Sequence, residues 1–167
     1  MDQSSTIRKQ LPRDWDHLTN RIIGCAIEVH SNLGPGLLEK FYEEALVCEL
    51  EHAGLRFSRQ HLINMMYKGR PLGEYRLDLV VEQLVIVELK VVEKVLDVHG
   101  AQLLSYLRSA NLPLGLLINF NHTRLVSGVT RRINDRSPLV RALPDLSPSF
   151  SPPSEHSELS SFVRNHQ

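Results

Sequence analysis

Residues 73–90 constrain the fold more than any other stretch, because they place three charges inside two apolar runs. Both runs are rich in β-branched residues and a polar pair separates them, which predicts a β-hairpin. The charges are Asp78 in the first run and Glu88 and Lys90 in the second. Charges among apolar neighbours are costly unless something compensates them, so their arrangement decides what the hairpin does.

The loop length of this hairpin decides which charges meet. Glu88 and Lys90 are two residues apart and therefore share a face of the strand. A three-residue loop, 82–84, would set Asp78 directly opposite Glu88, whereas a two-residue loop would point the two carboxylates to opposite faces. The loop contains no Gly or Asn, so the sequence leaves both registers open.

In the first register the two carboxylates repel each other, which raises one pKa unless a cation lies between them. Mg²⁺ or Mn²⁺ suits such hard oxygen ligands and commonly uses one or two carboxylates. Lys90 would then stabilise a developing oxyanion or help to activate a water. For these three residues alone, a solvated strand face with an ordinary Glu-x-Lys pattern is an equal alternative.

Two helices are predicted before the hairpin. Apolar residues at helical spacing follow Asp14, a candidate N-cap, up to a turn at 31–36. The second helix is expected over 37–53, with Glu39 and Tyr42 on one face, where Tyr42 either hydrogen-bonds Glu39 or packs. An acidic residue in a first helical turn is also favoured by the helix dipole alone. The glutamates at 43 and 44 are expected to be solvated or to stabilise the helix.

The remaining elements complete an α/β fold. Residues 55–68 are expected to form a strand, and a turn at 68–71 makes this strand an antiparallel neighbour of the hairpin. Asp97 is a candidate N-cap for a helix over 98–110. The apolar run 114–120 predicts a buried strand that a right-handed crossover brings parallel to the meander.

Three side chains of the 98–110 helix are candidates for a supporting role. Gln102 and Tyr106 are one turn apart and therefore face the same way. A polar helix flank explains this pair as well. His99, in the first turn, either binds phosphate or takes no part. A short edge strand is expected at 125–129, followed by four arginines that form a phosphate-binding or a solubilising patch: Arg131, Arg132, Arg136 and Arg141.

Length and composition bound the domain organisation. The 167 residues, 42% of them hydrophobic, support one domain, expected over 14–136, with a mobile lead at 1–13 and a Ser/Pro-rich, disordered tail at 137–167. A formal net charge of +0 draws the chain to neither nucleic acid nor membrane as a whole. No signal peptide or membrane span is evident, and Cys25 and Cys48 are expected to be buried thiols, which predicts a cytoplasmic protein.

The order of these features resembles the PD-(D/E)xK nuclease superfamily over about residues 18–133. The segment from Gly36 to Tyr42 resembles more narrowly the signature of the GxxExxY protein family. Gln102 and Tyr106 also match the Gln-x-x-x-Tyr element of RecB-like nucleases. The chain departs from the superfamily name at Leu77, which occupies the position of Pro. The resemblance implies a restriction-endonuclease-like core, a mixed β-sheet with an antiparallel meander and one parallel crossover strand, flanked by helices.

The resemblance also implies roles for individual residues. Asp78, Glu88 and the backbone carbonyl of Leu89 would bind the metal, Mg²⁺ or Mn²⁺, and Lys90 would be the catalytic lysine. Glu39 would orient a metal-bound water or support a second ion. Gln102 would orient active-site groups or a phosphate. The supporting residues would be Tyr106, Tyr42 and His99.

The implied function is hydrolysis of phosphodiester bonds in DNA, or less readily in RNA, with nucleic acid as the partner and a homodimer as one possible state. An alternative from another class is an interaction module for nucleic acid or protein that keeps the nuclease fold without turnover, because fold alone does not fix function. The neutral charge and small size favour that alternative.

Overall fold

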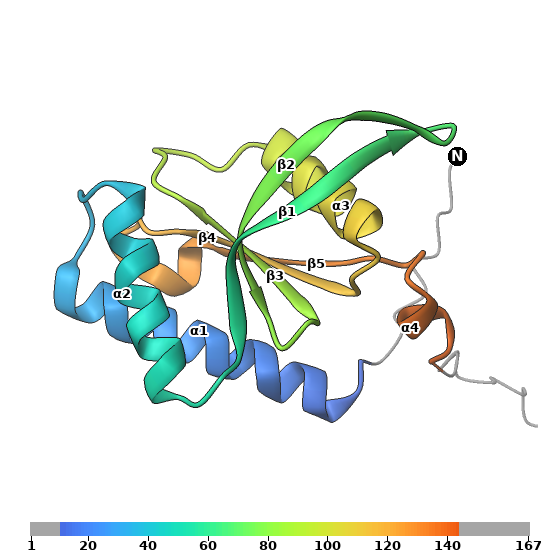
Figure 1. Ribbon diagram of the computed structural model, residues 1–167. Coiled ribbons are helices and arrows are strands. Elements are labelled where there is room, and N and C mark those ends of the chain that lie inside the picture. Colours follow the sequence, from blue (N-terminus) through green and yellow to red (C-terminus); the bar gives the residue numbers. More distant parts are fainter. Residues whose placement is uncertain (1–10, 144–167) are drawn as a thin grey trace, which may run out of the picture.

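A five-stranded mixed sheet forms the centre of the computed structural model, which describes residues 11–143 (Figure 1). The strands lie in the order β1-β2-β3-β4-β5, and only the β3–β4 pair is parallel. The predicted α/β class, with an antiparallel meander and one parallel crossover strand, is confirmed. The elements are α1 (Arg13–Leu33), α2 (Glu39–His52), β1 (Phe57–Tyr67), β2 (Arg70–Val81), β3 (Val85–Lys90), α3 (Asp97–Ala110), β4 (Leu114–Asn119), the 3₁₀ turn η1 (Leu125–Gly128), β5 (Val129–Ile133) and α4 (Pro138–Arg141).

The helices cover the two faces of the sheet separately. Figure 1 shows α1 and α2 below the edge-on strands β4 and β5, and α3 above them. Successive residues of β3 pack in two apolar clusters on opposite faces of the sheet. Val85, Val87 and Leu89 pack in the cluster with α1 and α2, whereas Ile86 packs in the cluster with α3. This alternation is the period of a strand buried on both faces, and it makes β3 the centre of the molecule.

The parallel strand β4 is buried along its whole length and packs tightly against α3. A Cβ built on Gly115 would lie 2.9 Å from Cγ of Leu103, the branch point of a fully buried side chain. Leu103 has no exposed end that can swing away. The glycine therefore sets the distance between α3 and the sheet.

Replacing Gly115 by alanine is expected to destabilise the fold by about 1–3 kcal/mol, the usual cost of overpacking a core. Urea unfolding followed by circular dichroism measures the change. Gly24→Ala is the matched control, because a Cβ on this exposed glycine of α1 meets nothing within 4 Å. The control is expected to gain up to about 1 kcal/mol from helix propensity. Equal destabilisation of both variants would contradict the packing account.

Several expected boundaries are wrong. α1 begins at Arg13 with Pro12 as its N-cap residue, so Asp14 lies in the first turn, and α3 begins at Asp97 after Leu96. Residues 125–128 form η1, and the edge strand is β5. The reason is local: alternating β-branched residues predict a strand but not where its hydrogen-bonded partner begins. Cys48 is exposed, whereas Cys25 is buried as expected.

The folded part extends past residue 136, the boundary that composition predicted. Ser137 and Val140 are buried, and α4 lies between 138 and 141. Leu11 is likewise buried in the α1–α2 cluster. The rest of the predicted lead, 1–10, and of the predicted tail, 144–167, lies outside the described residues.

The arginines after η1 do not form one patch. Arg131 donates to Asp16 and to Thr19 of α1, at 2.6 and 2.7 Å. Its neighbour Arg132 lies on the opposite face, where its guanidinium fills the space over Gly100 of α3. Successive residues of a strand point to opposite faces, which separates them. These two arginines therefore hold helices against the sheet edge.

Candidate nuclease site

The hairpin formed by β2 and β3 has the three-residue loop. Val81 pairs with Val85, and Leu79 with Val87, so the register places Asp78 opposite Glu88 one step further on. The backbone N–H of Leu89 donates to Oδ2 of Asp78 at 2.8 Å, which ties this carboxylate to β3. The register that brings the two acids together is therefore the one the chain adopts.

The pleat of β2 breaks at Asp78. Leu77 and Val80 are three residues apart, yet both belong to the apolar cluster with α3, which an ideal strand forbids. On the neighbouring strand Gln60 has φ of +47° and lies between the pairs Arg59–Leu79 and His61–Leu77. Irregular pairing of this kind turns a side chain out of the sheet plane. It frees the Asp78 carboxylate to bond the β3 backbone.

Glu88 is a buried carboxylate without full compensation. Glu88 is only 2% exposed, and no donor among the described residues hydrogen-bonds its Oε1. Oε2 accepts a long hydrogen bond from the Tyr75 hydroxyl, 3.4 Å, and lies 3.7 Å from Nζ of Lys90. Burial, followed by the charge of Asp78, raises the pKa of Glu88 to about 7, although Lys90 opposes this. A proton or a metal ion would relieve the same cost.

Lys90 lies at the end of β3, where it contacts the proposed ligands. Its ammonium donates to the backbone carbonyl of Leu89 at 3.0 Å. A carbonyl oxygen has a second lone pair, so Leu89 keeps one acceptor position. Lys90 is partly exposed, and its charge lowers the pKa of Asp78 as well as that of Glu88. The Lys90 ammonium is therefore close both to the carboxylates and to solvent.

Glu39 reaches the same place from another element. It is the first residue of α2, and burial raises its pKa, which Lys90 lowers and Asp78 and Glu43 raise further. Burial also raises the pKa of Asp78, against the hydrogen bond from Leu89. Glu39 therefore lies within electrostatic range of Asp78 and Lys90, the two residues whose charges also act on Glu88.

Glu43 also belongs to this acidic region, which the sequence did not indicate. Its charge raises the pKa of both Glu39 and Asp78. Its Oε1 accepts from Arg59 at 3.2 Å and its Oε2 accepts from Gln60 at 3.0 Å. The spacing of four residues from Glu39 was the available signal, because it puts both acids on one face of α2. Glu43 thus links the irregular part of β1 to the site.

The tyrosines support the site from behind. Tyr106 of α3 stacks on Tyr75 of β2 with ring centroids 4.0 Å apart, and Tyr75 donates to Glu88. Burial raises the pKa of the Tyr75 hydroxyl, so it remains a donor. The sequence singled out Tyr106 and missed Tyr75, whose signal was its place in β2 three residues before Asp78. Tyr106 therefore contacts the site through Tyr75.

Tyr42 supports the approach to α2 and does not bond Glu39. Its hydroxyl donates to the carbonyl of Gly34 at 2.6 Å and accepts from the N–H of Leu37 at 3.1 Å, and its ring stacks on Phe120 at 4.4 Å. Of the two predicted possibilities, packing is the one observed. The buried ring holds the loop that leads into Glu39.

The two other residues suggested on α3 have different places. Nδ1 of His99 accepts from the N–H of Leu96 at 3.1 Å, so this side chain caps the helix. Gln102 is exposed one turn before Tyr106, and no side-chain hydrogen bond joins it to another described residue. The structure therefore brings Asp78, Glu88 and Lys90 together, and no hydrogen bond joins Gln102 to any of them.

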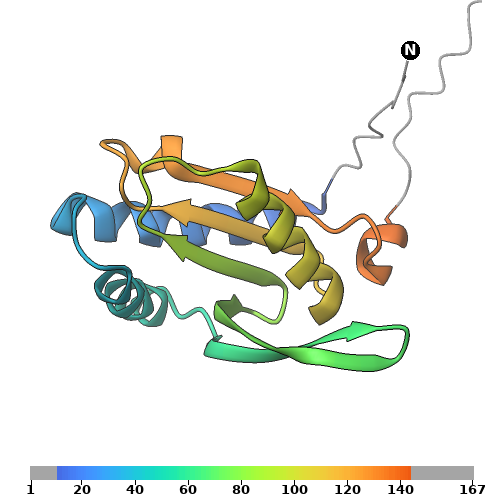
Figure 2. The same cartoon turned by 90° about the horizontal axis from the view of Figure 1, so that it is seen from above.

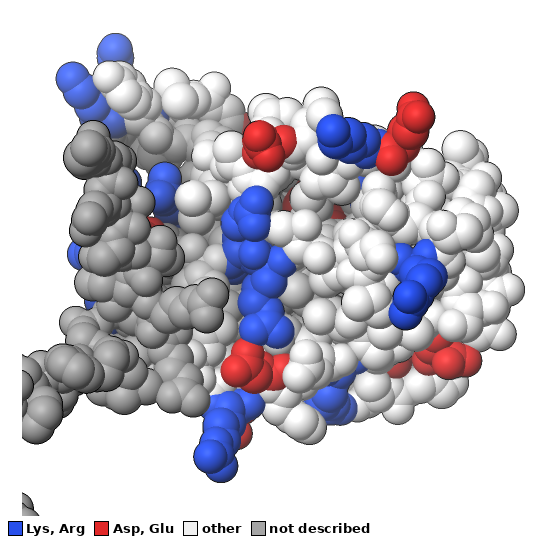
Figure 3. Space-filling view, turned by 180° about the vertical axis from the view of Figure 1, so that it is seen from behind, with Lys and Arg blue, Asp and Glu red and all other residues white. Residues whose placement is uncertain are grey.

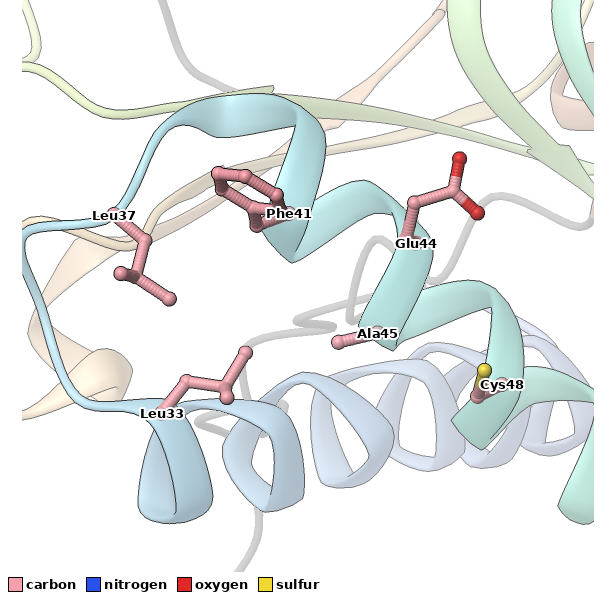
Figure 4. Close-up of a pocket in the computed structure, with 6 residues that line it drawn as sticks. All are labelled: Leu33, Leu37, Phe41, Glu44, Ala45 and Cys48. Atoms are coloured by element: carbon pink, nitrogen blue, oxygen red, sulfur yellow. The ribbon is translucent and has the colours of Figure 1, made fainter.

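A separate hollow lies between the end of α1 and the start of α2 (Figure 4). The side chains of Leu33, Leu37 and Phe41 point toward one another across it, whereas the carboxylate of Glu44 points away. An apolar hollow of this kind offers neither paired carboxylates nor a cation. The paired carboxylates and the lysine lie elsewhere, at the end of β3. The lining residues are Leu33, Leu37, Phe41, Glu44, Ala45 and Cys48.

The donor atoms at the end of β3 fit a hard divalent ion. Within residues 11–143 no cluster of three or more His, Cys, Asp or Glu side chains is arranged to hold a metal. Two carboxylates and one carbonyl form a different donor set, and it is present here: Asp78, the unbonded Oε1 of Glu88 and the carbonyl of Leu89. Oxygen donors of this kind suit Mg²⁺ or Mn²⁺.

Comparisons with known proteins give the family. In the described part of the chain no helix is long and apolar enough to cross a membrane. No curated protein and no solved structure matches the chain significantly. The family model described as PD-(D/E)XK nuclease superfamily matches residues 16–133, which span every strand of the sheet. The chain belongs to the PD-(D/E)XK nuclease superfamily.

Proposed function

We propose that this protein is a metal-dependent phosphodiesterase that hydrolyses DNA. Family membership supports nuclease-like chemistry on a nucleic-acid substrate. The single observation that carries the proposal is the Glu88 carboxylate, buried beside Asp78 with one oxygen unbonded and with a pKa of about 7. A fold without use for a cation gains nothing from this costly pair, because an apolar residue would be more stable there.

Five residues divide the work at the proposed site. Asp78, Glu88 and the Leu89 carbonyl hold the ion, and a bound Mg²⁺ or Mn²⁺ supplies a Lewis acid that polarises the scissile phosphate and lowers the pKa of water. Lys90 stabilises negative charge that gathers on the phosphate oxygens in the transition state. Glu39, whose pKa is raised by burial, accepts at its carboxylate the proton that the attacking water loses.

The narrower assignments also belong to the proposal. Gly36, Glu39 and Tyr42 support membership of the GxxExxY family, and the Tyr42 bonds to the loop before Glu39 give that spacing a physical use. Gln102 is proposed to contact a substrate phosphate, since it is exposed and free to turn. Tyr106, the tyrosine of the Gln-x-x-x-Tyr element, is proposed to support the site by stacking on Tyr75. A cytoplasmic location remains the prediction of the sequence.

Incubation of the full chain with supercoiled plasmid and with linear duplex DNA tests the proposal. Cutting is expected with Mg²⁺ or Mn²⁺ and is expected to stop in EDTA. Single-stranded and double-stranded RNA are the comparison substrates. Gel analysis of products against time separates internal nicks from trimming of ends. Absence of metal-dependent hydrolysis of every substrate would favour the interaction module.

A further inference from the structure

The β1–β2 hairpin extends far beyond the part that carries the site. We define the β1–β2 arm as residues 62–76 and its tip as residues 66–72. β2 pairs with β3 only over Leu79–Val81, so within the described residues the arm has two strands and no third. Figures 1 and 2 show the tip projecting past α3 and the rest of the sheet. From Leu62 to Tyr67 alone the strand rises by about 17 Å.

One face of the arm is fixed and the tip is free. Ile63, Met65 and Tyr75 pack in the apolar cluster with α3, so the base of the arm has a defined direction. The tip carries large apolar side chains that no element of residues 11–143 covers: Met66 is 54%, Tyr67 59% and Leu72 69% exposed. Exposed apolar side chains grouped on a projecting tip typically mark a binding surface.

The charge of the arm identifies the kind of partner. The chain as a whole has a formal net charge of +0, but the arm has three basic residues, Lys68, Arg70 and Arg76, against Glu74 alone. All three are exposed, and none forms an ion pair with another described residue. Seen from behind, Lys and Arg side chains project at the upper left, over the β1–β2 turn (Figure 3). An unpaired basic tip complements a polyanion.

We propose that the tip of the β1–β2 arm binds duplex nucleic acid beside the position that is cut. A two-stranded ribbon fits the major groove, which is about 12 Å wide. Lys68 and Arg70 contact phosphates, and Tyr67 and Leu72 rest against sugars and bases. Arg76 is two residues from Asp78, so the arm and the site lie on one continuous strand. This inference rests on the proposed function for its substrate class.

Binding is measured by fluorescence anisotropy with a fluorescein-labelled duplex DNA of about 30 base pairs, in EDTA, at several KCl concentrations. The variant Lys68→Ala/Arg70→Ala is expected to bind roughly 10–100-fold more weakly, and the slope of log affinity against log salt is expected to fall by about two. Tyr67→Ala is expected to weaken binding about tenfold with the same slope.

The matched control is Arg136→Ala/Arg141→Ala, which removes two exposed positive charges that follow β5, the strand at the sheet edge opposite β1. It is expected to bind as the wild type does. Equal loss in both double variants would overturn the inference, because binding would then follow overall charge. Unchanged binding of the arm variant would overturn it too, as would a wild-type chain that binds no duplex. The tip could instead hold two copies of the chain together. A dimer that Tyr67→Ala dissociates while duplex binding stays intact would also overturn the inference.

Hydrolysis of bis(p-nitrophenyl) phosphate with Mn²⁺ separates this inference from the proposed function. This small diester does not reach the arm, so the arm variant is expected to hydrolyse it at the wild-type rate. If the wild type hydrolyses the diester but its duplex binding is the same in the arm variant, the inference is overturned and the proposed function stands. Arm-dependent binding by a chain that never hydrolyses the diester would support the inference while the proposed function fails.

Discussion

Replacing Lys90 by methionine is expected to lower the rate of metal-dependent DNA cutting by about 10²–10³-fold. Methionine keeps the length of the side chain and removes the ammonium, which lies 3.0 Å from the Leu89 carbonyl and 3.7 Å from Glu88. The lost interaction is one that strengthens as charge gathers on the phosphate, so kcat should fall more than substrate affinity. Initial rates on a labelled duplex over a range of concentrations measure both.

Lys94→Met is the control for Lys90→Met. Lys94 is exposed in the segment between β3 and α3, so its replacement removes the same charge nearby without touching the carboxylates. Its rate is expected to stay within about threefold of the wild type, as for a surface position. Circular dichroism shows whether both variants are folded. Wild-type rates in Lys90→Met would contradict the catalytic role, and identical rates in every variant would indicate a contaminating nuclease.

The parts of the candidate site that can be predicted from the sequence are those that are close together along the chain. The β2–β3 hairpin is formed by neighbouring residues, and its sequence allowed two registers. In the observed three-residue loop, Glu82 and Gln83 both have positive φ although neither is glycine. The sequence could not choose, since neither residue is typical of such a conformation. Once the register is known, the opposition of Asp78 and Glu88 follows.

The parts that were missed depend on contacts between distant segments. Glu43 belongs to the site only because β1 passes beside α2 with Gln60 in a left-handed conformation, and no periodicity predicts that contact. Tyr75 is placed by its stacking on Tyr106, 31 positions further along the chain. Tyr42 shares a helix face with Glu39, but its partner turned out to be the loop before the helix. Side-chain direction within an element is predictable, whereas the choice of partner is set by tertiary packing.

Glu88→Gln is expected to make the folded chain more stable at pH 8 in EDTA, by up to about 3 kcal/mol. The folded-state pKa of Glu88 is raised from 4.5 to about 7 by burial and by Asp78. Between these two values the folded state holds a proton that the unfolded state has lost. Stability from this group is therefore full below pH 4.5 and is lost as the pH rises to 7. Glutamine carries no charge to bury, so the variant escapes that loss.

A divalent ion should reverse the order of the two proteins. Mg²⁺ that binds only the folded wild type stabilises it by about 4.1 kcal/mol at a concentration 1,000 times the Kd, which exceeds the advantage of the variant in EDTA. Glutamine at residue 88 offers a neutral oxygen, so the variant is expected to gain much less from the ion. Urea unfolding at pH 5 and pH 8, with Mg²⁺ or EDTA, measures all four combinations. Glu51→Gln, on an exposed position of α2, is the control and should follow the wild type throughout.

The comparison separates a metal site from a merely strained carboxylate. If Glu88 is only buried, the glutamine variant is more stable at pH 8 in every buffer and Mg²⁺ changes nothing. If Glu88 holds an ion with Asp78, the wild type gains stability from Mg²⁺ at pH 8 and much less at pH 5, where Glu88 retains its proton. A wild type that is equally stable at pH 5 and pH 8 in EDTA would contradict the buried charge itself. The readout needs no substrate, so it tests the cation at the end of β3 independently of whether the chain cuts DNA.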